Sequence, residues 1–219
     1  MDATILRNQI GHEEFDYQML LDCLRDYGRP RDKITDLLKK GVIVRVKKGL
    51  YVFGDPYRRR PVSREVLANL IYGPSYISLD YALQHHGLIP EAVETVTSVT
   101  CGRSRDFSTP FGAFSYRHTP LQAFQVGMDR VSLEDGRAFL IATPEKALAD
   151  KLAAERGSGL RTLAELQQHL IENLRIDPDG LRRLDPSRLA LIAKRLHSRK
   201  TRLLSRLVAR TKQTAEAAV

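Results

Sequence analysis

Residues 34–53 read ITDLLKKGVIVRVKKGLYVF, and this stretch decides how the N-terminal part of the chain folds. An amphipathic helical segment ends at Gly41, and two runs rich in β-branched and aromatic residues follow at residues 42–46 and 50–53. Only Lys-Lys-Gly separates the two runs. Such runs on either side of a short, glycine-containing turn predict a β-hairpin.

Three helices are predicted before the hairpin. Residues 2–9 have the apolar spacing of a short helix, and Asp16 is suited to cap a second helix that ends near Gly28. The third helix begins at Pro30, because the missing N–H of proline would be unsatisfied in the first turn of a helix anyway. Three helices followed by a hairpin is the order of a winged helix-turn-helix, which we expect over residues 1–54.

Basic residues are unevenly distributed along the 219-residue chain, which carries a net charge of +9. Residues 25–60 contain 12 basic and 4 acidic groups, residues 61–156 contain 9 and 11, and residues 182–212 contain 11 and one. Two basic ends around a weakly acidic middle indicate modules that bind nucleic acid or an acidic protein surface. The alternative is a soluble protein that simply has a high pI.

Breaks in composition divide the remainder of this α+β chain. Residues 55–62 hold two prolines and three arginines and predict an extended, solvated linker, or a segment that follows a phosphate backbone. Residues 63–156 predict a mixed α+β domain, and residues 157–219, which open with Gly-Ser-Gly, predict a basic helical region. Since no apolar run is long enough to cross a membrane and no secretory signal is visible, we expect a cytoplasmic protein.

Cap residues mark the helix starts of the central segment. Ser63 and Ser78 are suited to N-caps, and Thr-Pro-Glu at 143–145 combines an N-cap, a first-turn proline and an acid that complements the helix dipole. Asp-Gly at 135–136 predicts a two-residue hairpin turn. Strands are expected at residues 93–101, around 107, and at 114–117, 131–133 and 138–142.

The C-terminal region is predicted to form helices near residues 160–174, 178–184 and 187–210. The Asp-Pro pairs at 177–178 and 185–186 mark two of the starts, and the tail from Thr211 is expected to fray. Five apolar residues recur at helical spacing in the last helix and predict a buried stripe: Leu189, Ile192, Leu196, Leu203 and Leu207.

No catalytic or metal-binding constellation can be assembled from the sequence. His85 and His86 are adjacent, so on a helix they diverge by about 100° and cannot share a metal on one face. His118 adds no recognisable zinc spacing. Cys23 lies on a helical apolar stripe and Cys101 at a strand end, so we interpret both as core residues rather than reactive thiols. We therefore expect no enzymatic activity, no cofactor and no metal.

The DNA-binding prediction depends on the third helix and the hairpin. In helix-turn-helix docking the second helix of the motif lies in the major groove, with its N-terminal residues at the base edges. Arginine there can read guanine, whereas Lys39 fits a phosphate. The alternative for any one residue is a solvated charge, but their clustering favours an interface. The candidate DNA-binding residues are Arg29, Arg31, Lys33, Thr35, Lys39, Arg45, Lys47 and Lys48.

Two parts of the chain resemble AbiEi-type antitoxins, the antitoxin half of the type IV toxin–antitoxin systems of the AbiE abortive-infection family. One is the stretch of residues 34–53, which contains the hairpin sequence KKGVIVRVKKGLYVF at 39–53 and resembles the wing of these antitoxins. The other is similar to the central domain of the family. It contains YISLDYALQHHGLIPEAVETVTSVT at 76–100, FSTPFGAFSYRHT at 107–119 and ATPEKALADKL at 142–152.

The resemblance implies a bacterial antitoxin whose N-terminal domain represses its own operon at operator repeats in double-stranded DNA. Its partner would be a nucleotidyltransferase-like toxin, neutralised functionally if not by contact. Two alternatives remain open: a winged-helix regulator with a ligand-sensing central domain and no toxin, and a nucleic-acid-processing enzyme. The residues of the C-terminal helix expected to face toxin or DNA are Arg188, Lys194, Arg195, Arg199, Lys200, Arg202 and Arg206.

Overall fold

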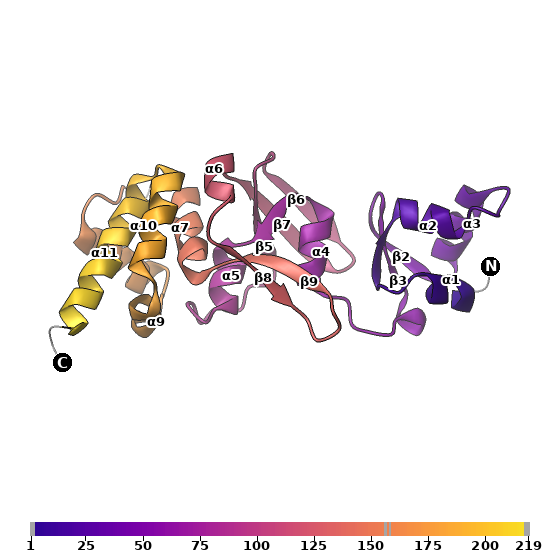
Figure 1. Ribbon diagram of the computed structural model, residues 1–219, viewed down its shortest axis with the longest axis horizontal. Coiled ribbons are helices and arrows are strands. Elements are labelled where there is room, and N and C mark those ends of the chain that lie inside the picture. Colours follow the sequence, from indigo (N-terminus) through magenta and orange to yellow (C-terminus); the bar gives the residue numbers. More distant parts are fainter. Residues whose placement is uncertain (1–2, 156, 158, 217–219) are drawn as a thin grey trace.

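The computed structural model describes residues 3–155, 157 and 159–216 (Figure 1). It is a mixed α+β protein with a helical C-terminal end. Three blocks follow one another along the long axis: an N-terminal block at one end, a central sheet with its helices, and a helical block at the other end (Figure 1). None of the described helices combines the length and the apolar character that crossing a lipid bilayer requires.

The N-terminal block combines three helices with a three-stranded antiparallel sheet of order β1-β3-β2. The predicted hairpin is present as β2 and β3, whereas β1 was not predicted from the sequence. Asp2 of the first predicted helix lies outside the described residues. The elements are α1 (Ala3–Gln9), β1 (Glu14–Asp16), α2 (Tyr17–Cys23), α3 (Pro30–Lys39), β2 (Ile43–Lys47) and β3 (Leu50–Phe53).

Local capping explains the ends of these helices. The Asp16 carboxylate accepts a hydrogen bond from the Met19 N–H, which confirms the predicted N-cap of α2. Gly41, at φ +66°, follows α3 and adopts a backbone conformation that other residues rarely take. The prediction that α2 continues to Gly28 is wrong, since the helix ends at Cys23. The apolar pattern continues only to the buried Leu24, and the exposed, charged Arg25 and Asp26 follow it.

The N-terminal block has its own hydrophobic core beneath the sheet. Cys23 packs against this core, and burial raises the pKa of its thiol, in keeping with the predicted core role. Met19, on the same helix, is instead 38% exposed. The other face of the hairpin packs into the core of the central block through Val46, Leu50 and Val52. The buried residues of the N-terminal core are Leu6, Ile10, Phe15, Leu20, Leu24, Ile34, Leu37, Val42, Ile43, Tyr51 and Phe53.

The segment between the two blocks is largely exposed, but it is also tethered to the central block. It opens with a short 3-10 helix, η1 (Asp55–Tyr57). The Arg58 guanidinium lies over the Phe111 ring of the central block, 5.5 Å from its centroid. Arg60 donates a hydrogen bond of 3.0 Å to the backbone carbonyl of Asp135. These side chains hold the segment against the central block because they find partners there.

The central block is built on a six-stranded mixed sheet of order β6-β7-β5-β4-β9-β8. The short β4, which was not predicted from the sequence, lies near its middle, antiparallel to β5 and parallel to β9. The elements are α4 (Arg64–Ile71), β4 (Ser75–Ile77), α5 (Leu79–His85), β5 (Val96–Thr100), β6 (Arg105–Thr109), β7 (Gly112–His118), α6 (Leu121–Phe124), β8 (Met128–Ser132), β9 (Ala138–Ala142) and α7 (Pro144–Ala154).

Two predicted caps of the central block are confirmed and a third differs. Ser63 accepts a hydrogen bond from the Val66 N–H, and Thr143 accepts one from the Lys146 N–H. Ser78 precedes α5 but makes no side-chain cap. Its hydroxyl points into the core instead and donates to a buried carboxylate, as described below.

The hairpin between β8 and β9 occurs where the Asp-Gly pair predicted it, but its turn is longer than two residues. Ser132 pairs with Ala138, and the Leu133 N–H donates to the Arg137 carbonyl. Gly136 takes φ +85°. The turn therefore spans three residues with glycine in the left-handed position, a common alternative for a glycine-containing hairpin.

The C-terminal block is helical, but the helix predicted over residues 187–210 is two helices. The chain reverses between them at His197, which takes φ +51°. The helix starts predicted at the two Asp-Pro pairs are confirmed, and Asp177 and Asp185 are the N-caps there. The second helix runs on through Thr211, so the expected fraying is absent up to residue 216, and residues 217–219 lie outside the described part. The elements are α8 (Leu163–Gln168), the π-helical η2 (His169–Asn173), α9 (Pro178–Arg183), α10 (Pro186–Leu196) and α11 (Arg199–Glu216).

The C-terminal helices share one hydrophobic core with the central sheet. Leu189 and Ile192 of α10 and Leu204 of α11 are fully buried in it, and α7 of the central block lies beside both helices (Figure 1). Leu203 and Leu207 are also buried, as the apolar stripe predicted, because the reversal at the end of α10 leaves the stripe of each helix facing inward.

Candidate nucleic-acid interface and a basic pocket

Helix α3 lies at the outer end of the N-terminal block and is amphipathic (Figure 1). Ile34 and Leu37 are buried in the block's core. Arg31, Thr35 and Lys39 are exposed. Since the buried and exposed residues alternate at helical spacing, the helix presents polar and cationic side chains to the outside while its apolar side anchors it.

Ion pairs within α3 divide its cations into two groups. Lys33 and Lys40 lie 3.3 and 3.1 Å from the Asp36 carboxylate, and the hydrogen bond from Lys40 is the main cause of the lowered pKa of Asp36. Arg31 and Lys39 have no acidic partner among the described residues. These two side chains are therefore the cations of α3 most available to a ligand.

Two further candidates at the start of α3 have local partners. Arg29 precedes the helix and lies 4.0 Å from Asp32, and both side chains are well exposed. The Thr35 hydroxyl donates a hydrogen bond of 3.0 Å to the Arg31 carbonyl within the helix. The Thr35 hydroxyl can therefore accept a hydrogen bond from a ligand, but its own proton is already donated to the Arg31 carbonyl.

The hairpin places its three candidate residues differently. Lys48, at the turn, is exposed. Arg45 is exposed and lies over the Tyr51 ring, 5.8 Å from its centroid. Lys47 is partly buried, and burial together with the nearby charge of Arg105 in the central block lowers the pKa of its amine. Lys47 thus belongs to the contact between the blocks, whereas Lys48 and Arg45 are open to a ligand.

A buried ion pair fixes the N-terminal block to the β8–β9 hairpin. Arg137 lies 2.7 Å from Glu14 and 2.7 Å from Asp135, and it also donates to the Pro61 carbonyl at 2.9 Å. Only 2% of the Glu14 side chain is exposed. Burial raises the pKa of Glu14, and the adjacent guanidinium partly offsets this effect. Sequence analysis missed this contact because its members are far apart in the chain.

The basic residues predicted to face toxin or DNA are not equivalent in the structure. Arg188 pairs with the buried Glu145 at 3.3 Å, so it helps to join α10 to α7. Arg199 donates to the Arg161 carbonyl at 3.5 Å, and Lys200 donates to a backbone carbonyl at the end of α7. Arg195 is exposed.

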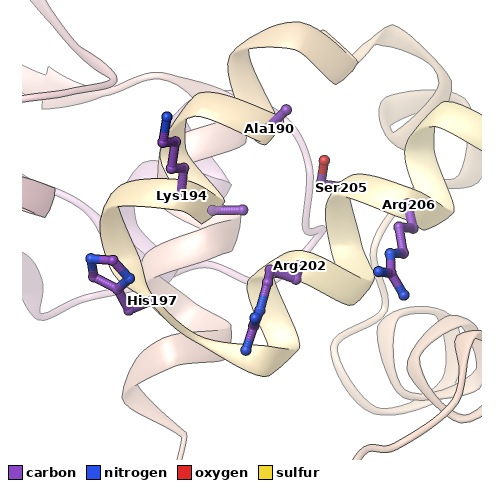
Figure 2. A pocket seen from close by; sticks show the side chains of 7 residues that line it. Ala190, Lys194, His197, Arg202, Ser205 and Arg206 are labelled. Carbon is purple, nitrogen blue, oxygen red and sulfur yellow. The ribbon is translucent and has the colours of Figure 1, made fainter.

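The remaining three, Lys194, Arg202 and Arg206, surround an open pocket of about 440 Å³ between α10 and α11 (Figure 2). Ala190 and Ser205 lie on the facing helices, and His197 lies at the turn that joins them (Figure 2). Ser205 and His197 could not be assigned to the site from the sequence, because the break between the helices that brings them there was not predicted.

A second cluster of polar groups is sealed inside the central block. The Lys146 ammonium lies 2.6 Å from the Asp150 carboxylate, which also accepts hydrogen bonds of 2.9 Å from the hydroxyls of Tyr76 and Ser78. Burial raises the pKa of Asp150 despite the adjacent Lys146. Lys146 and Asp150 are four residues apart on α7, so a contact between them could have been predicted from the sequence.

The residues considered and rejected for catalysis have structural partners. The His86 Nε2 lies 2.7 Å from the Ala142 carbonyl, and the His118 Nδ1 lies 2.9 Å from the Gly102 carbonyl. Cys101 is partly buried. Among residues 3–155, 157 and 159–216, no three His, Cys, Asp or Glu side chains are grouped so that they could hold a metal ion.

No protein-family model matches the chain, and no curated protein matches it either.

Proposed function

We propose that this chain is an AbiEi-type antitoxin that binds DNA, represses its own operon and neutralises a nucleotidyltransferase-like toxin in the cytoplasm. The observation that carries the DNA-binding part is the outer face of α3, where Arg31 and Lys39 are exposed without acidic partners on a helix that its apolar side anchors.

The N-terminal block is proposed to act as a winged helix-turn-helix. Its elements follow the order helix, strand, helix, helix and hairpin, and β3 lies between β1 and β2 in the sheet. With α3 in the major groove, Arg31 near its N-terminus would reach base edges and Lys39 a phosphate. Lys48, exposed at the hairpin turn, would meet the sugar-phosphate backbone beside the helix.

The antitoxin part rests on the resemblance of residues 76–152 to the AbiE central domain and on the basic surface of α10 and α11. Lys194, Arg195, Arg202 and Arg206 lie on these two helices without acidic partners in the described chain. Dense positive charge favours an acidic partner, such as the carboxylates with which a nucleotidyltransferase binds metal and nucleotide. We propose binding rather than catalysis as the mode of action.

One observation favours a second candidate function, a transcriptional regulator whose central block senses a small molecule without any toxin. A pocket of about 360 Å³ lies beside α5, where Asp80 and Lys151 face it together with apolar side chains. Asp80 and Lys151 form an ion pair of 2.8 Å and Glu91 also lines the pocket, so the pocket offers both charge and apolar surface. For this second function, a small molecule bound in this pocket would have to change the affinity of the protein for its operator DNA.

The experiment separates repression from neutralisation within the intact chain. Arg31→Ala should lose repression of the chain's own promoter yet still rescue growth when the neighbouring nucleotidyltransferase-like gene is co-expressed. A variant in which Lys194, Arg195, Arg202 and Arg206 become glutamine should do the reverse. Arg130→Gln, an exposed arginine on the β8–β9 hairpin, is the control and should retain both activities. Full repression and full rescue by all three variants would contradict the proposal.

A further inference from the structure

The pocket between α10 and α11 is lined by Lys194, Arg202, Arg206, His197 and Ser205, which carry positive charge or donate hydrogen bonds, together with Ala190 and Ala193. Lys194 lies on one wall and Arg202 and Arg206 on the other, and none of the described residues that line the pocket is acidic (Figure 2). Within the part of the chain that the structure describes, these three cations form no ion pair. Asp185, the only acid between residues 182 and 212, already accepts hydrogen bonds from backbone N–H groups at the start of α10.

The shape of the pocket is set by small side chains on rigid helices. Ala190 and Ser205 lie where α10 and α11 face each other, and their short side chains leave the space open. The inner sides of the two helices are fixed in the core by Ile192 and Leu204, which are fully buried. The pocket is therefore formed before any ligand arrives, which lowers the entropy cost of binding.

We infer that this pocket binds the phosphate chain of a nucleotide or of an inorganic polyphosphate. Arginine donates through a planar fork that matches two phosphate oxygens at once, and two arginines and a lysine supply donors for several oxygens in a row. A triphosphate group also brings enough negative charge to balance three cations. The volume of about 440 Å³ lies in the range of small-molecule sites.

A single carboxylate or a DNA duplex fits these features less well. A carboxylate presents two oxygens and one charge to a site with three cations. A duplex carries its phosphates on the outside of a wide cylinder, so it would touch the rim and leave the space between Ala190 and Ser205 empty. Filling the pocket should therefore weaken the binding of a phosphate chain but not the binding of a DNA duplex. The proposed site does not depend on whether the chain is an antitoxin.

The test is calorimetric titration of the full chain with sodium tripolyphosphate and, separately, with ATP at about 150 mM salt, where weak surface attraction is screened. Binding of both ligands assigns the site to phosphate chains in general. Binding of ATP alone assigns it to nucleotides. Binding of neither overturns the inference.

Variants locate the site. Arg202→Gln and Arg206→Gln should each weaken tripolyphosphate binding about tenfold or more, because each removes charge-assisted hydrogen bonds. Ala190→Leu should weaken it to a similar degree by filling the pocket, with every charge retained. Arg195→Gln on the same helix is the matched control, since Arg195 is exposed but does not line the pocket, and it should change the affinity less than about twofold.

Two outcomes would contradict the proposal that the phosphate chain binds in this pocket. One is an unchanged affinity in Ala190→Leu, with Ser205→Leu as a second filling variant should the first fail to fold. The other is an equal loss in Arg195→Gln and Arg202→Gln, which would indicate diffuse attraction. Duplex DNA that bound the filled and unfilled proteins equally, while tripolyphosphate bound neither, would assign the surface to nucleic acid instead.

Discussion

The Arg137 guanidinium donates a hydrogen bond of 2.7 Å to the Glu14 carboxylate, although 123 residues separate the two in the chain. Arg137 belongs to the turn between β8 and β9, and Glu14 begins β1. The contact therefore ties the block that carries α3 to the sheet of the central block. Both side chains are largely buried, so removing one of them would leave the charge of the other buried without a partner.

We expect Arg137→Ala to lower the free energy of unfolding by about 3 kcal/mol, because Glu14 would stay buried without its partner. Urea denaturation followed by circular dichroism measures the change. Arg130→Ala, an exposed position on the same hairpin, should stay within about 0.5 kcal/mol of the wild type. Equal stability of the two variants would show that the ion pair does not hold the blocks together.

Lys146→Met should destabilise the protein by about 3–5 kcal/mol, since it leaves the Asp150 carboxylate buried beside an apolar group. The double variant Lys146→Met with Asp150→Asn should recover most of that loss, because the asparagine is neutral and its amide oxygen can still accept the hydrogen bonds of Tyr76 and Ser78. A thermodynamic cycle over the two single variants and the double variant gives the coupling energy. Additive losses would mean that the two groups act independently, contrary to their separation of 2.6 Å.

Acid should weaken the N-terminal cap of α10. Hydrogen bonds from the backbone N–H groups of Arg188 and Ser187 hold the pKa of Asp185 below its ordinary value of 3.8. A carboxyl with a lower pKa in the folded state adds stability that is present above the unfolded value and is lost as the pH falls through the folded value. The stability difference between wild type and Asp185→Asn should therefore shift against the wild type below pH 3.8. Urea unfolding of both proteins from pH 6 to pH 3 checks the sign, and a constant difference would contradict it.

Operator binding should respond differently to α3 and to the hairpin. Arg31→Ala should cost about 1–3 kcal/mol on the chain's own promoter and relax the preference for one base pair. Lys48→Ala should weaken all sequences alike and reduce the salt slope by about 1, because it removes a phosphate contact. Lys47→Ala should change the slope less, since Lys47 faces the central block.

Mobility shifts at several salt concentrations compare these three variants with Arg130→Ala, which should bind as the wild type does. An unchanged affinity in both Arg31→Ala and Lys48→Ala would rule out this docking of α3.

Helix starts were the most predictable part of the fold. Asp16, Ser63, Thr143 and Asp185 each cap the helix that the sequence assigned to them, because a cap depends on a side chain and the backbone two or three residues away. The glycine at 41 likewise ended its helix for a local reason. Interactions of this range can be recognised from neighbouring residues alone.

Elements that depend on distant partners were missed. Strand β4 has only three residues and owes its place to β5 and β9, which pair with it from later in the chain. The break between α10 and α11 lacks proline and glycine, and the apolar spacing continues across it. Core packing sets the reversal at His197. The same holds for the candidate site. Its basic residues could be identified from the sequence, but their grouping around a pocket could not, because it depends on the packing of α10 against α11.

The place of β4 in the sheet affects the order in which the protein can fold during synthesis. All residues of the N-terminal core precede residue 54, so that block can form as soon as it leaves the ribosome. Ile77 of β4 pairs with Ile141, which is translated much later. Until then one edge of β4 remains open and can pair with a strand of another nascent chain. During translation of residues 78–140 that edge of β4 therefore lacks its partner strand, whereas the finished sheet pairs β4 on both sides.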